Sequence, residues 1–179
     1  HHGFKLIMDL FSNSSLIKEI PELKRKSGID PQQLSDFISG IRDYHGGVYQ
    51  HSLNVARLAA QLAIQLELTT LEVYMIVIGG LLHDIGKLRL PYTILDKENK
   101  LNQNEWMLVK KHPQIGMNLI SRYEWAQQLK PMILLHHERL DGQGYYAVAA
   151  KELPLSARII CLVDAFDAMV SPRPYQKQR

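Results

Sequence analysis

The feature that most constrains the fold is the apolar segment at residues 73–82, VYMIVIGGLL, which is followed directly by His83 and Asp84. At ten residues it is well short of the roughly 18 needed to cross a bilayer, so we expect no direct membrane insertion. The segment must therefore be surrounded by other parts of the protein. An imidazole and a carboxylate at the end of such a helix are costly to bury unless each has a partner. We expect this helix to run from about residue 71 to Gly86, with Gly86 as its C-terminal cap.

Helical periodicity dominates the rest of the chain, and no run of strict alternation indicates a sheet. We therefore predict an all-α fold, a helical bundle. Asp30-Pro31 with Gln33, and Asn102 with Glu105, carry the pattern of helix N-termini. Pro113 is expected to kink or restart the helix that opens at Asn102. The remaining expected helices cover about residues 51–66, 125–137 and 154–168, with a loop at 139–153.

Composition excludes some classes of protein. With 179 residues, 46% of them hydrophobic, the chain is long enough for one domain with a sizeable core. The formal net charge of +3 is too small to indicate a DNA-binding groove. Cys161 is the only cysteine, so no internal disulfide can form, and a reducing, cytoplasmic location is expected.

Histidines and aspartates on separate helical segments are expected to face inward. His51 shares a stripe with Val55 and Leu62, and Asp164 shares one with Ile160. The full set is His51, His83, Asp84, His112, His136, His137 and Asp164.

Each of these residues alone has an ordinary explanation, such as a hydrogen-bonded core histidine. Together they require a common counter-charge, which metal ions supply. Imidazoles with carboxylates and no thiolates favour iron, manganese or catalytic zinc over a structural zinc site. A single metal ion would leave some of these seven ligands unused, whereas two ions would use all of them. The sequence therefore indicates a metal-assisted phosphoester hydrolase.

The motifs HDIGK with LP, KHPQIG, HHERLDGQGY and ARIICLVDAFDAMVSPRPY follow one another in the order and spacing of a known family. Over about residues 48–175 the chain resembles the HD-GYP group of HD phosphohydrolases. The resemblance implies an all-helical HD core with two or three divalent metals, commonly iron or manganese, with zinc, nickel or magnesium as further candidates in a preparation. It also implies hydrolysis of cyclic di-GMP to linear pGpG or to GMP by a metal-activated hydroxide.

The resemblance also assigns roles by matching motif. One metal would be held by His51, His83, Asp84 and Asp164, and the other by Asp84, His112, His136 and His137. Asp84 would bridge the two ions, and both Asp84 and Lys87 would be catalytic. Lys87 and Arg173 would bind the substrate phosphates. Asp167 would contribute to a third metal, position a water molecule, or support a metal ligand from outside the ligand shell.

Three departures from the family pattern affect these expectations. Members with a third metal have a glutamate where this chain has Gly47, so we expect two metals and pGpG as the product. The GYP motif reads Gly144-Tyr145-Tyr146, in a loop that the family associates with signalling partners. Gln176 stands where a basic residue is common.

We expect residues 1–45 to form an N-terminal helical extension, with His1-His2 a tag remnant. Residues 46–179 would form an HD-GYP-type catalytic domain that is short at its C-terminus. Two alternatives stay open at this point. One is an HD phosphohydrolase of another nucleotide, and the other is a weak or inactive module that binds nucleotide or a signalling partner. The oligomeric state is not predicted.

Overall fold

The computed structural model describes residues 18–171, and every regular element in that range is a helix. The α-helices are α2 (Ile20–Ser27), α3 (Pro31–Tyr44), α4 (Gly46–Gln65), α5 (Thr70–Leu82), α6 (Tyr92–Leu95), α7 (Gln103–Val109), α8 (His112–Ile120), α9 (Ala126–Leu134) and α10 (Leu155–Val170). Two short 3-10 helices, η2 (Ile85–Arg89) and η3 (Ala150–Glu152), complete the set. The predicted all-α fold is confirmed.

Two helices begin where their capping residues predict. The Asp30 side chain accepts a hydrogen bond from the backbone N–H of Gln32 at 2.7 Å, and Pro31 opens α3. Asn102 and Glu105 form a reciprocal capping box at the start of α7. In each case a side chain satisfies a backbone donor that has no partner within the helix.

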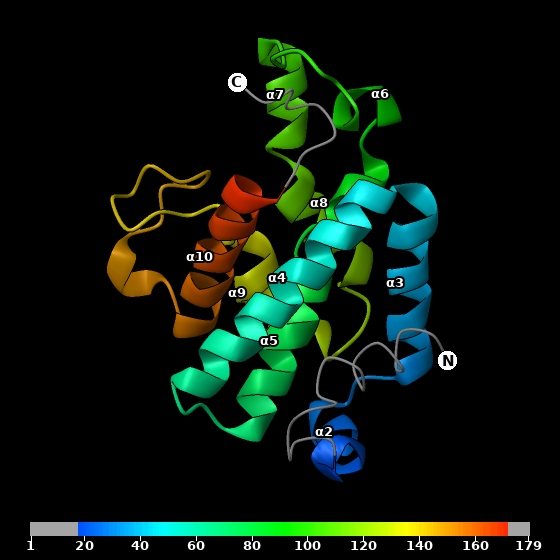
Figure 1. Cartoon of the computed structure of the whole chain (residues 1–179), viewed down its shortest axis with the longest axis vertical. Helices are drawn as coiled ribbons and strands as arrows, with labels where there is room; N and C mark the ends of the chain where they lie inside the picture. Colours follow the sequence, from blue (N-terminus) through cyan, green and yellow to red (C-terminus); the bar gives the residue numbers. More distant parts are fainter. Residues whose placement is uncertain (1–17, 172–179) are drawn as a thin grey trace.

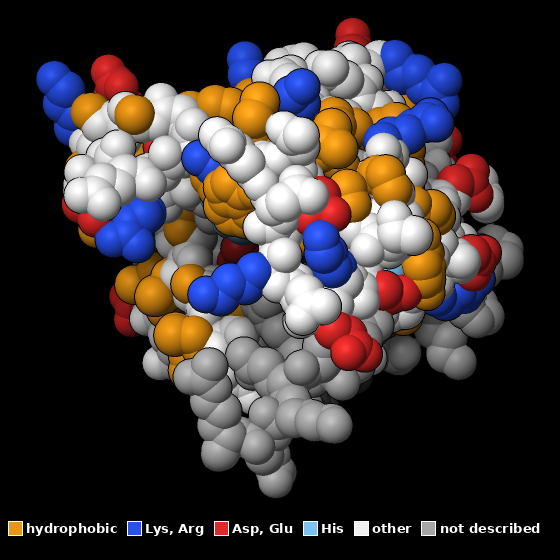
Figure 2. Space-filling model, turned by 90° about the horizontal axis from the view of Figure 1, so that it is seen from above, with side chains coloured by type: hydrophobic (Ala, Val, Ile, Leu, Met, Phe, Trp, Pro, Cys, Tyr) orange, Lys and Arg blue, Asp and Glu red, His pale blue; other side chains and the backbone are white. Residues whose placement is uncertain are grey.

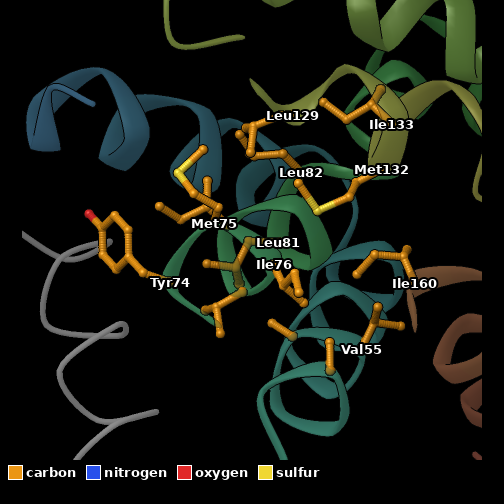
Figure 3. Close-up of a cluster of buried hydrophobic side chains, with 14 of the residues drawn as sticks. Val55, Tyr74, Met75, Ile76, Leu81, Leu82, Leu129, Met132, Ile133 and Ile160 are labelled. Carbon is orange, nitrogen blue, oxygen red and sulfur yellow. The ribbon is translucent and has the colours of Figure 1, made fainter. Parts of the chain in front are cut away.

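Helix α5 lies at the centre of the bundle, as the apolar segment predicts. Residues 73–82 are all buried, and α5 packs against α4, α9 and α10. Figure 1 shows α4 and α5 side by side, with α9 and α10 on one flank and α3 on the other. The close-up in Figure 3 shows side chains of α5 between those of α4 and α9. The core therefore fixes the end of α5, where His83 and Asp84 follow.

The end of α5 differs from our expectation. The α-helix ends at Leu82 rather than Gly86, and the chain turns at residues 83–84 into η2. Gly86 is not a left-handed cap, because the positive-φ glycines of the described chain are Gly28 and Gly142. A Cβ at Gly86 would lie 1.9 Å from the carbonyl oxygen of His112. Glycine is therefore needed here for close backbone packing of η2 on α8.

Two further helix boundaries also differ. The segment opening at Asn102 is divided in two, since α7 ends at Val109 and α8 begins at His112, with Pro113 in its first turn. Pro113 thus restarts the helix, one of the two outcomes predicted. Helix α9 ends at Leu134 rather than near residue 137, so His136 and His137 lie just beyond it. Because of these two boundaries, His112 lies at the start of a helix and His136 and His137 lie just after the end of one. These helix ends converge on the start of η2.

Membrane-spanning helices are absent from residues 18–171. None of the helices described there is both long enough and apolar enough to span a bilayer.

Candidate metal centre

Seven side chains from five parts of the chain form a cluster that has Asp84 at its centre. They come from α4 (His51), the α5–η2 turn (His83, Asp84), the start of α8 (His112), the segment after α9 (His136, His137) and α10 (Asp164). The Asp84 carboxylate lies within 4 Å of four imidazole Nε2 atoms: 3.1 Å from His112, 3.4 Å from His83, 3.7 Å from His136 and 3.8 Å from His51. The structure thus brings together all seven residues that the sequence analysis selected as metal ligands.

Three of the histidines are oriented in the same way. The Nδ1 atoms of His83, His112 and His136 each lie 2.7–2.8 Å from the carbonyl oxygen three residues earlier in the chain. Because a carbonyl only accepts, Nδ1 must carry the proton, and the lone pair is on Nε2. All three lone pairs therefore face the centre, as in metal-binding histidines whose other nitrogen is held by a backbone carbonyl.

Some of the polar atoms at the centre lack partners that would stabilise them. The Nε2 atoms of His112 and His136 lie 3.0 Å apart, and in the tautomers above neither carries a proton. The buried atoms Nε2 of His83 and Oδ1 of Asp84 have no hydrogen-bond partner. Leaving such atoms unpaired in a protein interior costs about 1–3 kcal/mol each. A cation at the centre would satisfy all of them, so these residues fit divalent metal ions.

Distances between possible ligand atoms divide the cluster into overlapping groups. Ligand atoms lie within 4.8 Å of one another in three sets: Asp84, His112, His136 and His137; His51, His83 and Asp84; and His83, His136 and Asp164. Asp84 belongs to two of the sets, which suits a carboxylate shared by two ions. Nδ1 of His137 also lies 3.5 Å from Oδ2 of Asp164, so a member of the first set lies close to a member of the third.

The protonation states suit metal binding at neutral pH. Burial alone would raise the pKa of Asp84, but Lys87, His83 and the other imidazoles hold it well below its usual range. Burial lowers the pKa of His136 to about 4, and burial with the neighbouring His136 lowers that of His137 to about 2. The carboxylate is therefore ionised and these two imidazoles are neutral, as metal ligands must be.

His51 is held from both sides by carboxylates. Its Nδ1 lies 2.6 Å from Oδ2 of Asp167, and its Nε2 lies 2.9 Å from Oδ1 of Asp164. Asp167 in turn accepts a hydrogen bond from the Ser171 hydroxyl at 2.6 Å. Burial lowers the pKa of His51, but Asp164, Asp84 and Asp167 raise it above the usual value overall. Asp167 thus contacts the Nδ1 side of His51, whose Nε2 faces Asp164.

Of the two residues expected to bind phosphate, Lys87 is among the described residues and Arg173 is not. The Lys87 ammonium forms an ion pair with Oδ2 of Asp84 at 2.5 Å, and its side chain is 22% exposed. It therefore lies between the buried carboxylate and solvent. Arg173 falls outside the described residues. Figure 2, seen from above the view of Figure 1, shows a hollow in the surface with acidic side-chain atoms at its floor and basic side chains near its rim.

Glu138 is a buried residue whose role the sequence analysis missed. It is 4% exposed, and its two carboxylate oxygens accept hydrogen bonds from the backbone N–H groups of Tyr146 at 2.6 Å and Val148 at 2.8 Å. A Cβ at Gly144 would lie 2.5 Å from Glu138. Glu138 therefore anchors the loop that follows His137. Its position directly after His136 and His137 was the only sequence signal.

Residues 18–171 thus form an all-helical domain with a buried histidine and aspartate cluster that could hold divalent metal ions. The profile of the HD domain family matches residues 36–179, and this chain belongs to that family. The expected resemblance to its HD-GYP members is confirmed. HD-domain phosphohydrolases bind divalent metals, in agreement with the cluster described above.

Curated relatives are cyclic dinucleotide phosphodiesterases by name. The chain is 42% identical over 131 residues to cyclic di-GMP phosphodiesterase PA4108 of Pseudomonas aeruginosa, covering 72% of this chain and 32% of that protein. It is 35% identical over 164 residues to the cyclic di-GMP phosphodiesterase response regulator RpfG of Xanthomonas campestris, covering 90% and 42%. The 3'3'-cGAMP-specific phosphodiesterase 1 of Vibrio cholerae is 36% identical over 138 residues, covering 72% and 30%. The chain thus spans less than half the length of these relatives.

Solved structures support the fold. Bd1817 of Bdellovibrio bacteriovorus, a protein described as HDG"Y"P, superposes with a TM-score of 0.61 at 23% identity, covering 69% of this chain and 41% of that one. The HD domain of the L. monocytogenes phosphodiesterase PgpH, in complex with cyclic-di-AMP, gives 0.60 at 21% identity, covering 77% and 75%. At these identities the likeness concerns the fold alone.

Proposed function

We propose that this chain is the catalytic domain of a metal-dependent phosphodiesterase that hydrolyses cyclic di-GMP to linear pGpG. The observation that carries the proposal is the convergence of three imidazole Nε2 atoms on the Asp84 carboxylate, with Nε2 of His83 and Oδ1 of Asp84 lacking any hydrogen-bond partner. The names of the relatives PA4108 and RpfG support cyclic di-GMP as the substrate. We also propose that the enzyme acts in the cytoplasm.

In this proposal the ligands divide as the family motifs suggest. One ion is held by His51, His83, Asp84 and Asp164, and the other by Asp84, His112, His136 and His137. When bound, two divalent ions, which we propose to be iron or manganese, supply Lewis acidity toward a phosphodiester and activate a water molecule. Gly47 provides no additional carboxylate, which favours two ions and the linear product. Asp167 keeps the His51 ring in position through its 2.6 Å contact with Nδ1.

Lys87 is proposed to act on the substrate rather than on the ions. Its ammonium is the partly exposed cation at the edge of the buried cluster. A phosphate entering from solvent would meet this charge next to Asp84. An ammonium placed there stabilises negative charge that develops on the phosphoryl oxygens or on the leaving oxygen. Arg173 is proposed to contact a second phosphate oxygen.

A second candidate substrate is 3'3'-cGAMP. The observation in its favour is the 36% identity to the 3'3'-cGAMP-specific phosphodiesterase 1 of Vibrio cholerae, close to the 35% identity with RpfG. The metal centre does not distinguish the two substrates, since they share the phosphodiester and differ in a base. The expected signalling partner of the Gly144-Tyr145-Tyr146 loop stays a prediction.

The test is an assay of metal-defined protein. The chain is freed of metal with a chelator, reloaded with Fe²⁺ or Mn²⁺, and incubated separately with cyclic di-GMP, 3'3'-cGAMP and cyclic di-AMP, with products identified by chromatography. We expect no turnover without metal and pGpG from cyclic di-GMP after reloading. Preferred cleavage of 3'3'-cGAMP would show that 3'3'-cGAMP, and not cyclic di-GMP, is the substrate. Binding without turnover under every metal would reject the proposed phosphodiesterase activity.

A further inference from the structure

We propose that Trp106 and Lys110, together with Tyr145, form a nucleobase-binding subsite beside the metal centre. We refer to these three residues as the aromatic wall. The inference rests on the proposed function and deepens it, because it names the part of the site that would contact a base rather than a phosphate.

The aromatic wall joins two segments that are distant in the sequence. The Tyr145 ring lies against His137, with ring centroids 4.5 Å apart and planes tilted by 37°. Trp106 of α7 meets Tyr145 edge to face, with centroids 6.0 Å apart. The Lys110 ammonium lies 5.3 Å from the Tyr145 ring centroid and 5.8 Å from that of Trp106. A continuous aromatic and cationic surface therefore begins at a proposed metal ligand and extends outward.

Trp106 is not part of the hydrophobic core. Helix α7 contains no buried residue, and Trp106 is 44% exposed. Trp125, by contrast, is 4% exposed and packs within the bundle. An indole that is held in place yet partly open to solvent offers a surface on which a flat ring can stack. A lysine next to it adds attraction for a base edge rich in acceptors, such as the O6 and N7 atoms of guanine.

The aromatic wall is held in position by its surroundings. Glu138 fixes the loop around Tyr145 through its bonds to the N–H groups of Tyr146 and Val148. On the other side, Glu105 caps α7 and forms an ion pair with Lys97 at 2.6 Å. A surface fixed on both sides loses little conformational entropy when a ligand binds. This favours a preformed subsite.

The position of the aromatic wall suits a base that is joined to a reacting phosphate. Tyr145 contacts His137 directly, and Trp106 lies one ring further from the metal centre. In a nucleotide the ribose separates the phosphate from the base. A phosphate held at Asp84 and Lys87 would thus leave its base next to Tyr145 and Trp106. The competing explanation is a purely structural clamp, in which the same contacts only hold α7 against the loop.

The kinetic test compares substrates with and without a base. Trp106→Ala is assayed with cyclic di-GMP and with methyl 4-nitrophenyl phosphate, a diester that lacks a nucleobase. We expect the ratio of the two kcat/KM values to fall about tenfold, mainly through a higher KM for cyclic di-GMP, as loss of one base stack implies. Trp106→Phe should recover most of the ratio. Met107→Ala is the matched control, because Met107 is 53% exposed on the same helix and should leave the ratio at the wild-type value.

A fluorescence test separates this inference from the proposed function. The chain has two tryptophans, and Trp125 is buried, so cyclic di-GMP that stacks on Trp106 should quench a large part of the emission. Quenching that is lost in Trp106→Ala supports the subsite even if no turnover is found, a result that would reject only the enzyme. Turnover of cyclic di-GMP with an unchanged substrate ratio in Trp106→Ala would overturn the subsite alone. Equal losses for both substrates would show a structural clamp.

Discussion

Replacing Asp84 with asparagine is expected to lower kcat/KM for cyclic di-GMP by more than about a thousandfold. The amide keeps the size of the carboxylate but removes the charge that four imidazoles and Lys87 surround. It also removes one of the two oxygens that would bridge the ions. The loss should therefore appear mainly in kcat and should not be recovered by raising the metal concentration. Steady-state kinetics with Mn²⁺-loaded protein measures it.

Asp141→Asn provides the matched control for this substitution. Asp141 is also an aspartate in an ion pair, with Arg139, but its side chain is 42% exposed and it belongs to none of the three ligand sets. Its removal should change kcat/KM by less than about twofold, because exposed ion pairs contribute little. Activity of Asp84→Asn within tenfold of wild type would contradict the bridging role of Asp84.

Replacing Gly86 with alanine is expected to lower the free energy of unfolding by about 3 kcal/mol or more. The new Cβ would lie 1.9 Å from the His112 carbonyl oxygen and 2.6 Å from the Gly116 backbone nitrogen. Because both obstacles are backbone atoms, η2 must move away from α8. That movement separates Asp84 from His112, so metal affinity should fall together with stability. Urea unfolding followed by circular dichroism gives the stability, and titration with Mn²⁺ gives the affinity.

The control for Gly86 is Gly46, the first residue of α4. A Cβ at Gly46 would meet no atom within 4 Å. Gly46→Ala should therefore stay within about 0.5 kcal/mol of wild type. If Gly86→Ala were as stable as Gly46→Ala, the close contact between η2 and α8 would be wrong, and with it the fixed position of Asp84 relative to His112.

The sequence predicted the helical class, two capped helix starts and the seven clustered residues for identifiable reasons. Capping at Asp30 and Asn102 is a local interaction between residues two or three positions apart, so it can be read from the chain. Inward-facing histidines such as His51 are visible through helical spacing. The sequence predicted that the seven residues lie together because inward-facing imidazoles and carboxylates need a common counter-charge.

The features that the sequence did not predict depend on contacts between distant segments. No local pattern encodes the end of α5 at Leu82 or the close packing of Gly86 on the carbonyl of His112, 26 positions later. The sequence left several roles open for Asp167, and could not show its 2.6 Å contact with His51, 116 positions away. Glu138 looks like a polar residue after a helix until its bonds to Tyr146 and Val148 are seen. Helix boundaries and side-chain roles of this kind are determined by contacts between segments that are distant in the sequence.

The number of metal ions bound by each chain is the most direct measurement of the proposed centre. Chelated protein is reloaded with excess Mn²⁺, desalted, and its manganese content is measured by atomic emission together with the protein concentration. A cluster in which Asp84 is shared by two ligand sets predicts two ions per chain for wild type and at most one for Asp84→Asn. No bound manganese, or an equal content in wild type and Asp84→Asn, would contradict the bridged two-metal centre.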